Sequence, residues 1–83
     1  MLTKRQLARL RAAAVTPGSN RLGLALSLMG VSQGRVAGAV GVPQPYVSDV
    51  VRGRYRTITV ANARRFARYC GCLIEDLFPA DTE

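Results

Sequence analysis

Apolar residues in the centre of the chain recur at helical spacing in two short runs that Gly41 separates. The runs lie in residues 33–40 and 44–51. Within each run the apolar residues fall three or four positions apart, as they do on one face of a helix. They are Val36, Ala37 and Val40 in the first run, and Val47 and Val50 in the second. The pattern predicts two short helices that share a core face across a tight glycine turn.

The same periodicity predicts helices on both sides of this pair. Residues 3–14 form a candidate helix that begins with a Thr-x-x-Gln capping box. Residues 21–29 form a second helix that is apolar nearly all round and therefore needs cover on two sides. A longer helix is predicted over residues 60–70 and a short closing turn over residues 73–78. We therefore expect an all-α fold, a compact bundle of about five helices with an additional N-terminal helix.

The additional apolar face of helix 21–29 has two candidate covers: the N-terminal helix, or a second protein chain. The leucines on the two surfaces are Leu7, Leu10, Leu24 and Leu28. Pro-Gly in residues 16–20 marks the only linker-like stretch. We accordingly divide the chain into a basic N-terminal helix with linker (1–18), a helical domain (19–79) and a frayed tail (80–83).

Composition and charge favour one folded domain with an anionic partner. The chain has 83 residues, of which 48% are hydrophobic and 6% aromatic, which predicts a single aliphatic core. The net charge is +7 and unevenly distributed: nine of the twelve basic residues lie in residues 1–56, where Asp49 is the only acid. This asymmetry indicates a polyanionic partner for one surface; simple solvation of the charges is the alternative.

Catalysis, metal binding and membrane insertion find little support. The chain has no histidine, no carboxylate pair in a cleft-forming context and no glycine-rich phosphate loop, so we predict no catalytic residues. Cys70 and Cys72 are the only cysteines and cannot supply a four-ligand zinc site, so we predict no metal and no cofactor. The chain also lacks the ~20-residue apolar run of a membrane span and the apolar core of a signal peptide. We expect a cytoplasmic protein.

The outer face of helix 44–51 carries residue types that read bases in the major groove. Gln44 can pair with adenine, and Ser48 is small enough for close approach. Asp49, a lone acid in a basic region, can accept a hydrogen bond from cytosine or orient an arginine. Tyr46 either faces the groove or packs its ring beside the turn, and we predict the groove side.

Basic residues near this helix are candidates for phosphate contacts. Arg52, Arg54 and Arg56 directly follow the helix, where they can reach the DNA backbone or form a solvated face. Arg35 adds positive charge to the first turn of helix 33–40, where an anion would offset the local conflict with the helix dipole. A solvated arginine is the alternative there.

The central segment resembles the helix-turn-helix of the Cro and phage-repressor class of bacterial transcriptional regulators. The resemblance rests on the order and spacing of several pairs. These are Ser32-Gln33 opening the first helix, Gly41-Val42 at the turn, Val47-Ser48 in the second helix and Arg52-Gly53 at its end, with Ala37 at the small-residue position. It extends from about Asn20 to the closing residues 74–78 and leaves residues 3–14 outside. Pro43 departs from the pattern by replacing the usual capping Ser or Thr.

The resemblance implies five packed helices and a homodimer on a two-fold operator. It implies that Gln33 binds a phosphate, that Gln44, Ser48 and Asp49 face bases, and that Arg52 and Arg54 hold the DNA backbone. The expected function is that of a sequence-specific double-stranded DNA-binding regulator of repressor type, bacterial or phage-encoded and nucleoid-associated when bound. The alternative is an antitoxin or adaptor module with secondary DNA binding, whose protein partner contacts the four leucines.

Overall fold

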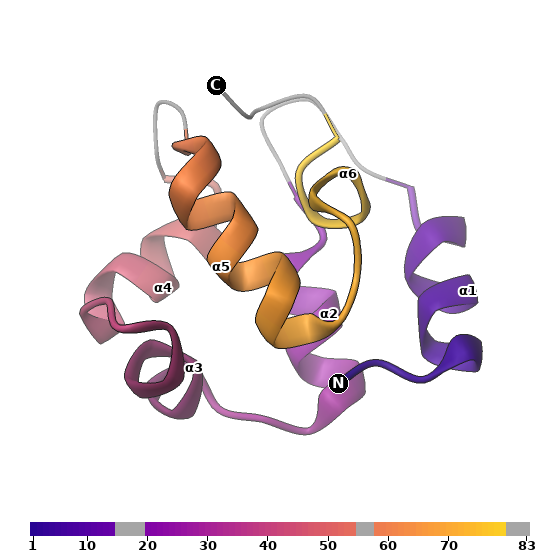
Figure 1. The fold of residues 1–83 in the computed structure, drawn as a ribbon, viewed down its shortest axis with the longest axis horizontal. Coiled ribbons are helices and arrows are strands. Elements are labelled where there is room, and N and C mark those ends of the chain that lie inside the picture. The colour runs from indigo at the N-terminus through magenta and orange to yellow at the C-terminus, as the bar shows by residue number, and fades with distance from the viewer. Residues whose placement is uncertain (15–19, 55–57, 80–83) are drawn as a thin grey trace.

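The computed structural model describes residues 1–14, 20–54 and 58–79, and these residues form helices without a strand. The all-α prediction is confirmed. The six described helices are α1 (Lys4–Ala12), α2 (Leu22–Met29), α3 (Gln33–Val40), α4 (Gln44–Val51), α5 (Val60–Cys70) and α6 (Ile74–Leu77), as labelled in Figure 1. The predicted tail, residues 80–83, lies outside the described residues.

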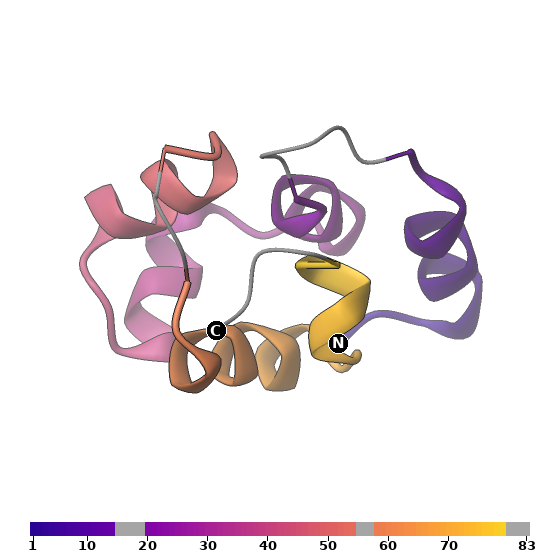
Figure 2. The same cartoon turned by 90° about the horizontal axis from the view of Figure 1, so that it is seen from above.

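The helices surround one core to which each of them contributes. Figure 2 shows α5 along one edge of the molecule and α4 along the opposite edge, with α1 at the far end from the α3–α4 pair. Helix α5 contacts α2, α3 and α6, while α2 also contacts α4. The largest fully buried side chains are Phe66, Phe78, Leu10, Leu22, Ile58, Leu77, Val36, Val47, Val50 and Cys70.

Side-chain caps define where three of the helices begin. The hydroxyl of Thr3 accepts a hydrogen bond from the Gln6 N–H, and Gln6 Oε1 accepts one from the Thr3 N–H, which confirms the predicted capping box. The hydroxyls of Ser32 and Thr59 cap α3 and α5 by accepting from the third N–H of each helix. These caps satisfy N–H groups that have no partner within the helix.

Helix α1 covers the additional apolar face of α2. Leu10 is fully buried, and Leu7 and Leu28 pack half-buried against the core. Gln6 Nε2 also donates to the backbone oxygen of Leu28 at 2.8 Å. Of the four leucines on these two surfaces, only Leu24 is exposed, at 38%. Leu10 is therefore not open to a partner, and α1 covers much of the partner surface predicted from Leu7, Leu10, Leu24 and Leu28, while Leu24 stays exposed.

Polar contacts between distant parts of the chain hold the far end of α1. Arg11 donates to Asp76 from Nε at 2.8 Å and from Nη2 at 3.1 Å. Asp76, 7% exposed, also accepts from the Leu73 N–H at the start of α6. These donors, the Arg11 guanidinium foremost, lower the pKa of Asp76. Arg21 donates to the backbone oxygen of Ala13 from Nε at 3.1 Å and from Nη2 at 3.0 Å, so the chain after α1 is tied to the start of α2.

Candidate nucleic-acid interface

A glycine turn fixes α3 and α4 relative to one another. Gly41 has a φ of +82°, a left-handed conformation that side chains rarely adopt, and its N–H donates to Ala37 O at 2.9 Å. The Val42 N–H donates to the same oxygen at 3.1 Å. Both helices then turn their apolar faces inward, and Val36, Ala37, Val47 and Val50 are all buried. The predicted helix pair and its turn are confirmed.

The inner side of α4 is seated closely on α2. A Cβ atom at Gly23 of α2 would lie 3.1 Å from Val51 Cγ1, so glycine permits the close approach of α4. Asn20 Nδ2 donates to the backbone oxygen of Val50 at 2.7 Å, while Asn20 Oδ1 accepts from the Leu22 N–H at 2.9 Å. The end of α4 and the start of α2 thus share one amide side chain, which orients α4 on the core.

The end of α4 is a tight left-handed turn at Gly53, which has a φ of +72°. The Gly53 N–H donates to Val50 O at 3.1 Å, and the Arg54 N–H donates to Asp49 O at 2.7 Å. This pair of bonds is the Schellman arrangement that closes many helices. It holds the backbone of Arg52 and Arg54 against the last turn of α4, and both side chains are exposed.

The outer face of α4 is polar and open to solvent. Gln44, Asp49 and Arg52 are exposed and Ser48 is half-buried. The one ion pair among the described residues joins α1 to α6, so Asp49 pairs with no arginine in that part of the chain. Both roles predicted for Asp49, hydrogen bonding to a base and orienting an arginine, therefore stay predictions.

Gln44 lies across the first turn of α3. A Cβ atom at Gly34 would sit 3.3 Å from Gln44 Oε1 and 3.6 Å from Gln44 Cδ. The lack of a side chain at Gly34 therefore leaves room for the Gln44 amide. At Gly38, one turn further along α3, nothing lies within 4 Å of the Cβ position. The contact brings the start of α4 beside the start of α3, where Gln33 is half-buried.

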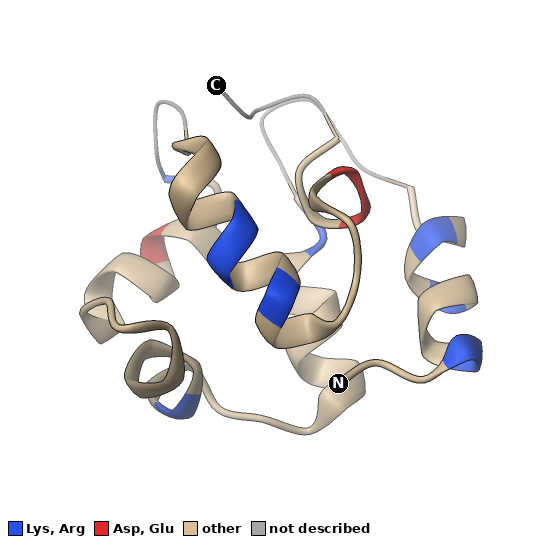
Figure 3. Cartoon of the chain, in the orientation of Figure 1, with Lys and Arg blue, Asp and Glu red and all other residues tan. Residues whose placement is uncertain are grey.

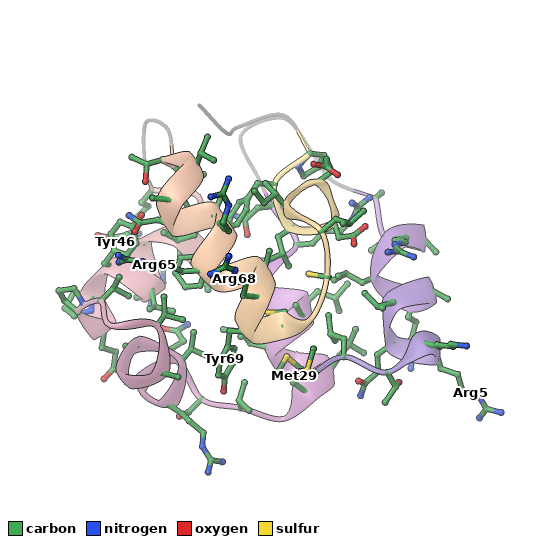
Figure 4. All side chains as sticks on the ribbon, in the orientation of Figure 1. Arg5, Met29, Tyr46, Arg65, Arg68 and Tyr69 are labelled. Carbon is green, nitrogen blue, oxygen red and sulfur yellow. The ribbon has the colours of Figure 1, made fainter. Side chains whose placement is uncertain are left out.

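Tyr46 packs inward, which corrects the prediction that it faces the groove. Its ring stacks on Phe66 with centroids 6.4 Å apart and planes inclined by 14°. Its hydroxyl accepts a hydrogen bond from Asn62 Nδ2 at 3.0 Å. Figure 4 shows Tyr46 between α4 and α5. The signal in the sequence was its position four residues before Val50, which places it beside the core stripe of α4.

The remaining predicted phosphate contacts are not all brought together. Arg35 is exposed on α3, but it lines a hollow of about 460 Å³ with Thr3, Met29 and Tyr69, on the side toward the N-terminal segment. Arg56 lies outside the described residues. Gln44, Ser48 and Asp49 lie on α4, Arg52 and Arg54 lie just past its end, and Gln33 and Arg35 lie in the first turn of α3.

Two short helices joined at a glycine turn, with the polar face of the second exposed, define a helix-turn-helix unit. A model of the helix-turn-helix domain family matches residues 5–78, and the chain belongs to that family. No curated protein and no solved structure matches the chain. Membership supports DNA binding as the class of function and a typically non-enzymatic domain. The match includes most of α1, so the pattern of this helix-turn-helix family extends beyond the segment from Asn20 to residue 78 on which the resemblance rests.

Two further findings bear on partners and ligands. No helix within the described residues is long and apolar enough to span a membrane. In the same part of the chain, no group of three or more His, Cys, Asp or Glu side chains lies together. Cys70 is buried, Cys72 is half-buried, and both carry free thiols.

Proposed function

We propose that this protein is a sequence-specific double-stranded DNA-binding regulator that places α4 in the major groove of an operator. The observation that carries the proposal is the division of α4 into two faces. Val47 and Val50 are fully buried, while Gln44, Asp49 and Arg52 are exposed beside a half-buried Ser48. B-DNA's major groove admits an α-helix and shows a distinct donor and acceptor pattern for each base pair.

Gln44, Ser48 and Asp49 are the proposed base-reading residues. The amide of Gln44 suits adenine N6 and N7, and the carboxylate of Asp49 suits the amino group of cytosine. The contact of Gln44 with the first turn of α3 supports this role, because it limits the positions that the amide can take. A restricted side chain loses less conformational entropy on binding.

Gln33, Arg52 and Arg54 are the proposed phosphate contacts. Gln33 is the first residue of α3, where free N–H groups and the helix dipole favour an anion. Arg52 and Arg54 stand at the other end of the interface, on a backbone that the Gly53 turn holds in place. Such contacts fix the register of the protein on the duplex without reading its sequence. Arg56 is a further candidate from the sequence alone.

A homodimer on a two-fold operator completes the proposal, with half-sites ~34 Å apart. Occupation of the operator would repress transcription, as in the Cro and phage-repressor class that the central segment resembles. The alternative of an antitoxin or adaptor module has no observation in its favour, because the leucine surface predicted for its partner is largely covered by α1.

The proposal is tested by measuring DNA affinity at several salt concentrations, with fluorescence anisotropy of a duplex obtained by in-vitro selection. About four to six phosphate contacts predict a log–log salt slope of about −4 to −5 per protomer. Arg52→Ala and Arg54→Ala should each weaken all duplexes similarly and reduce the slope by about 1. Arg9→Ala, which removes one exposed charge from α1, is the matched control and should leave the slope unchanged. Equal effects of the three variants would reject the assigned interface.

A further inference from the structure

A second basic surface lies on α5, away from the residues proposed to read DNA. We call it the α5 groove. It has a volume of about 360 Å³ and is lined by Ala39, Val40, Arg65, Arg68 and Tyr69. Ala39 and Val40 belong to the last turn of α3, whereas Gln44 lies against the first turn of that helix. Figure 4 labels the three α5 residues along the side of the molecule that faces the viewer.

The charge of the α5 groove has no counterpart within the described residues. Arg65 and Arg68 lie three positions apart and so on neighbouring parts of one helix face. Both are exposed, and neither forms an ion pair among the described residues. Helix α5 carries no acid, and Figure 3 shows the acidic residues of the described chain on α4 and α6. One of these, Asp76, is already paired with Arg11.

The lining of the α5 groove also has an apolar part, Ala39 and Val40, which we call its floor. Val40 is half-buried against the core and Ala39 is exposed. Tyr69, also half-buried, lines the groove as well. A phosphate backbone would satisfy the two guanidinium groups but offers nothing aliphatic for this floor. A peptide with carboxylates on either side of an aliphatic side chain fits both parts, since burial of the aliphatic group adds to the charge attraction.

We infer that the α5 groove docks an acidic segment of another protein, with an aliphatic side chain over Ala39 and Val40 and carboxylates beside Arg65 and Arg68. Figure 2 shows α5 and α4 on opposite edges of the molecule. The inference does not rest on the proposed DNA binding.

The probe is a fluorescently labelled peptide of Glu and Leu residues, titrated with the full chain. Arg65→Ala/Arg68→Ala should lower its affinity about twofold to thirtyfold, the loss expected for two ion pairs at a surface. The charge-matched control is Arg9→Ala/Arg64→Ala, because Arg64 is exposed on α5 about 100° around the helix from Arg65 and does not line the groove. It should change the affinity less than about twofold. Circular dichroism establishes that each variant is folded.

Further measurements test the apolar floor and whether the groove binds a peptide or nucleic acid. Ala39→Gln, which fills the floor without changing charge, should weaken the Glu-Leu peptide, and a peptide of Glu and Ser should bind the wild type more weakly. Equal losses in the two double variants would overturn the inference, as would failure of the wild type to bind the Glu-Leu peptide. Displacement of that peptide by a random duplex, with weaker duplex binding in Arg65→Ala/Arg68→Ala, would assign the groove to nucleic acid instead. Loss of DNA binding in Arg52→Ala reports only on α4, so the two proposals fail separately.

Discussion

The helix-turn-helix pair and α1 are attached to the same core by different means. The pair is held by buried aliphatic side chains at helical spacing and by glycine turns within a few residues. Helix α1 contributes one fully buried leucine, Leu10, and the half-buried Leu7, and it is also held by polar bonds to groups far along the chain. The helix-turn-helix pair therefore depends mainly on packing, with the Asn20 amide as a polar tie, while α1 combines a smaller apolar contact with specific donors and acceptors.

The largest expected effect comes from removing a buried side chain on which the helix-turn-helix pair packs. Phe66 is fully buried and contacts both Tyr46 of α4 and Phe78 after α6. Phe66→Ala should lower the free energy of unfolding by about 3–5 kcal/mol, since it leaves a large cavity beneath α4. Urea denaturation measures the loss. Phe66→Leu, which keeps much of the volume, should cost clearly less, and equal costs would argue against packing as the cause.

The polar attachment of α1 should give a smaller effect. Asp76→Ala removes the acceptor of Arg11 and of the Leu73 N–H and should lower the unfolding free energy by about 1–3 kcal/mol. Glu75→Ala is the matched control, because Glu75 is the neighbouring acid in the same helical turn and is exposed. If the two variants lose equal stability in urea, the Arg11–Asp76 contact does not hold α1.

The same contact makes stability depend on pH in the acid range. The pKa of Asp76 is lowered from its ordinary value of 3.8, chiefly by the hydrogen bond from Arg11. The Asp76 carboxylate therefore stays ionised to a lower pH in the folded state than in the unfolded state. The resulting stability is present above about pH 4 and is lost as pH falls through the lower, folded pKa. Urea titrations of wild type and Asp76→Asn should converge below about pH 4. A constant difference across that range would exclude the linkage.

Tyr46→Phe should have the smallest effect on stability, and it tests whether Tyr46 packs inward on α5. The substitution removes the hydrogen bond with Asn62 but keeps the ring on Phe66, so the expected loss is about 0.5–1.5 kcal/mol in urea denaturation. Asn62→Ala should cost a similar amount, and the double variant little more. The base preference of the selected DNA should not change. A changed preference would return Tyr46 to the groove side.

The fold could be predicted largely because its signals are local. Helix starts followed from caps such as Ser32 and Thr59, and helix ends from glycines such as Gly41, each within a few residues of the periodic apolar positions. The attachment of α1 could not be predicted. Arg11 and Asp76 are 65 residues apart in the chain, and nothing in their neighbourhoods indicates that they meet.

The candidate site was predictable to the level of the helix face. The positions of Val47 and Val50 decide which side of α4 is buried, and hence that Gln44 and Asp49 point away. The side of Tyr46 was predicted wrongly, because a residue at the margin of an apolar stripe can turn either way. The partner Phe66, on a different helix, decides it.

The central claim is that α4 reads bases through Gln44. The most direct measurement is in-vitro selection of duplexes from a random pool by wild type, Gln44→Ala and Arg54→Ala at one salt concentration. We predict that Arg54→Ala selects the same sequence as wild type with lower affinity, whereas Gln44→Ala loses preference at one base pair in each half-site, at a cost of about 1–3 kcal/mol there. Selection of the wild-type sequence by Gln44→Ala, with that base pair still required, would contradict the account.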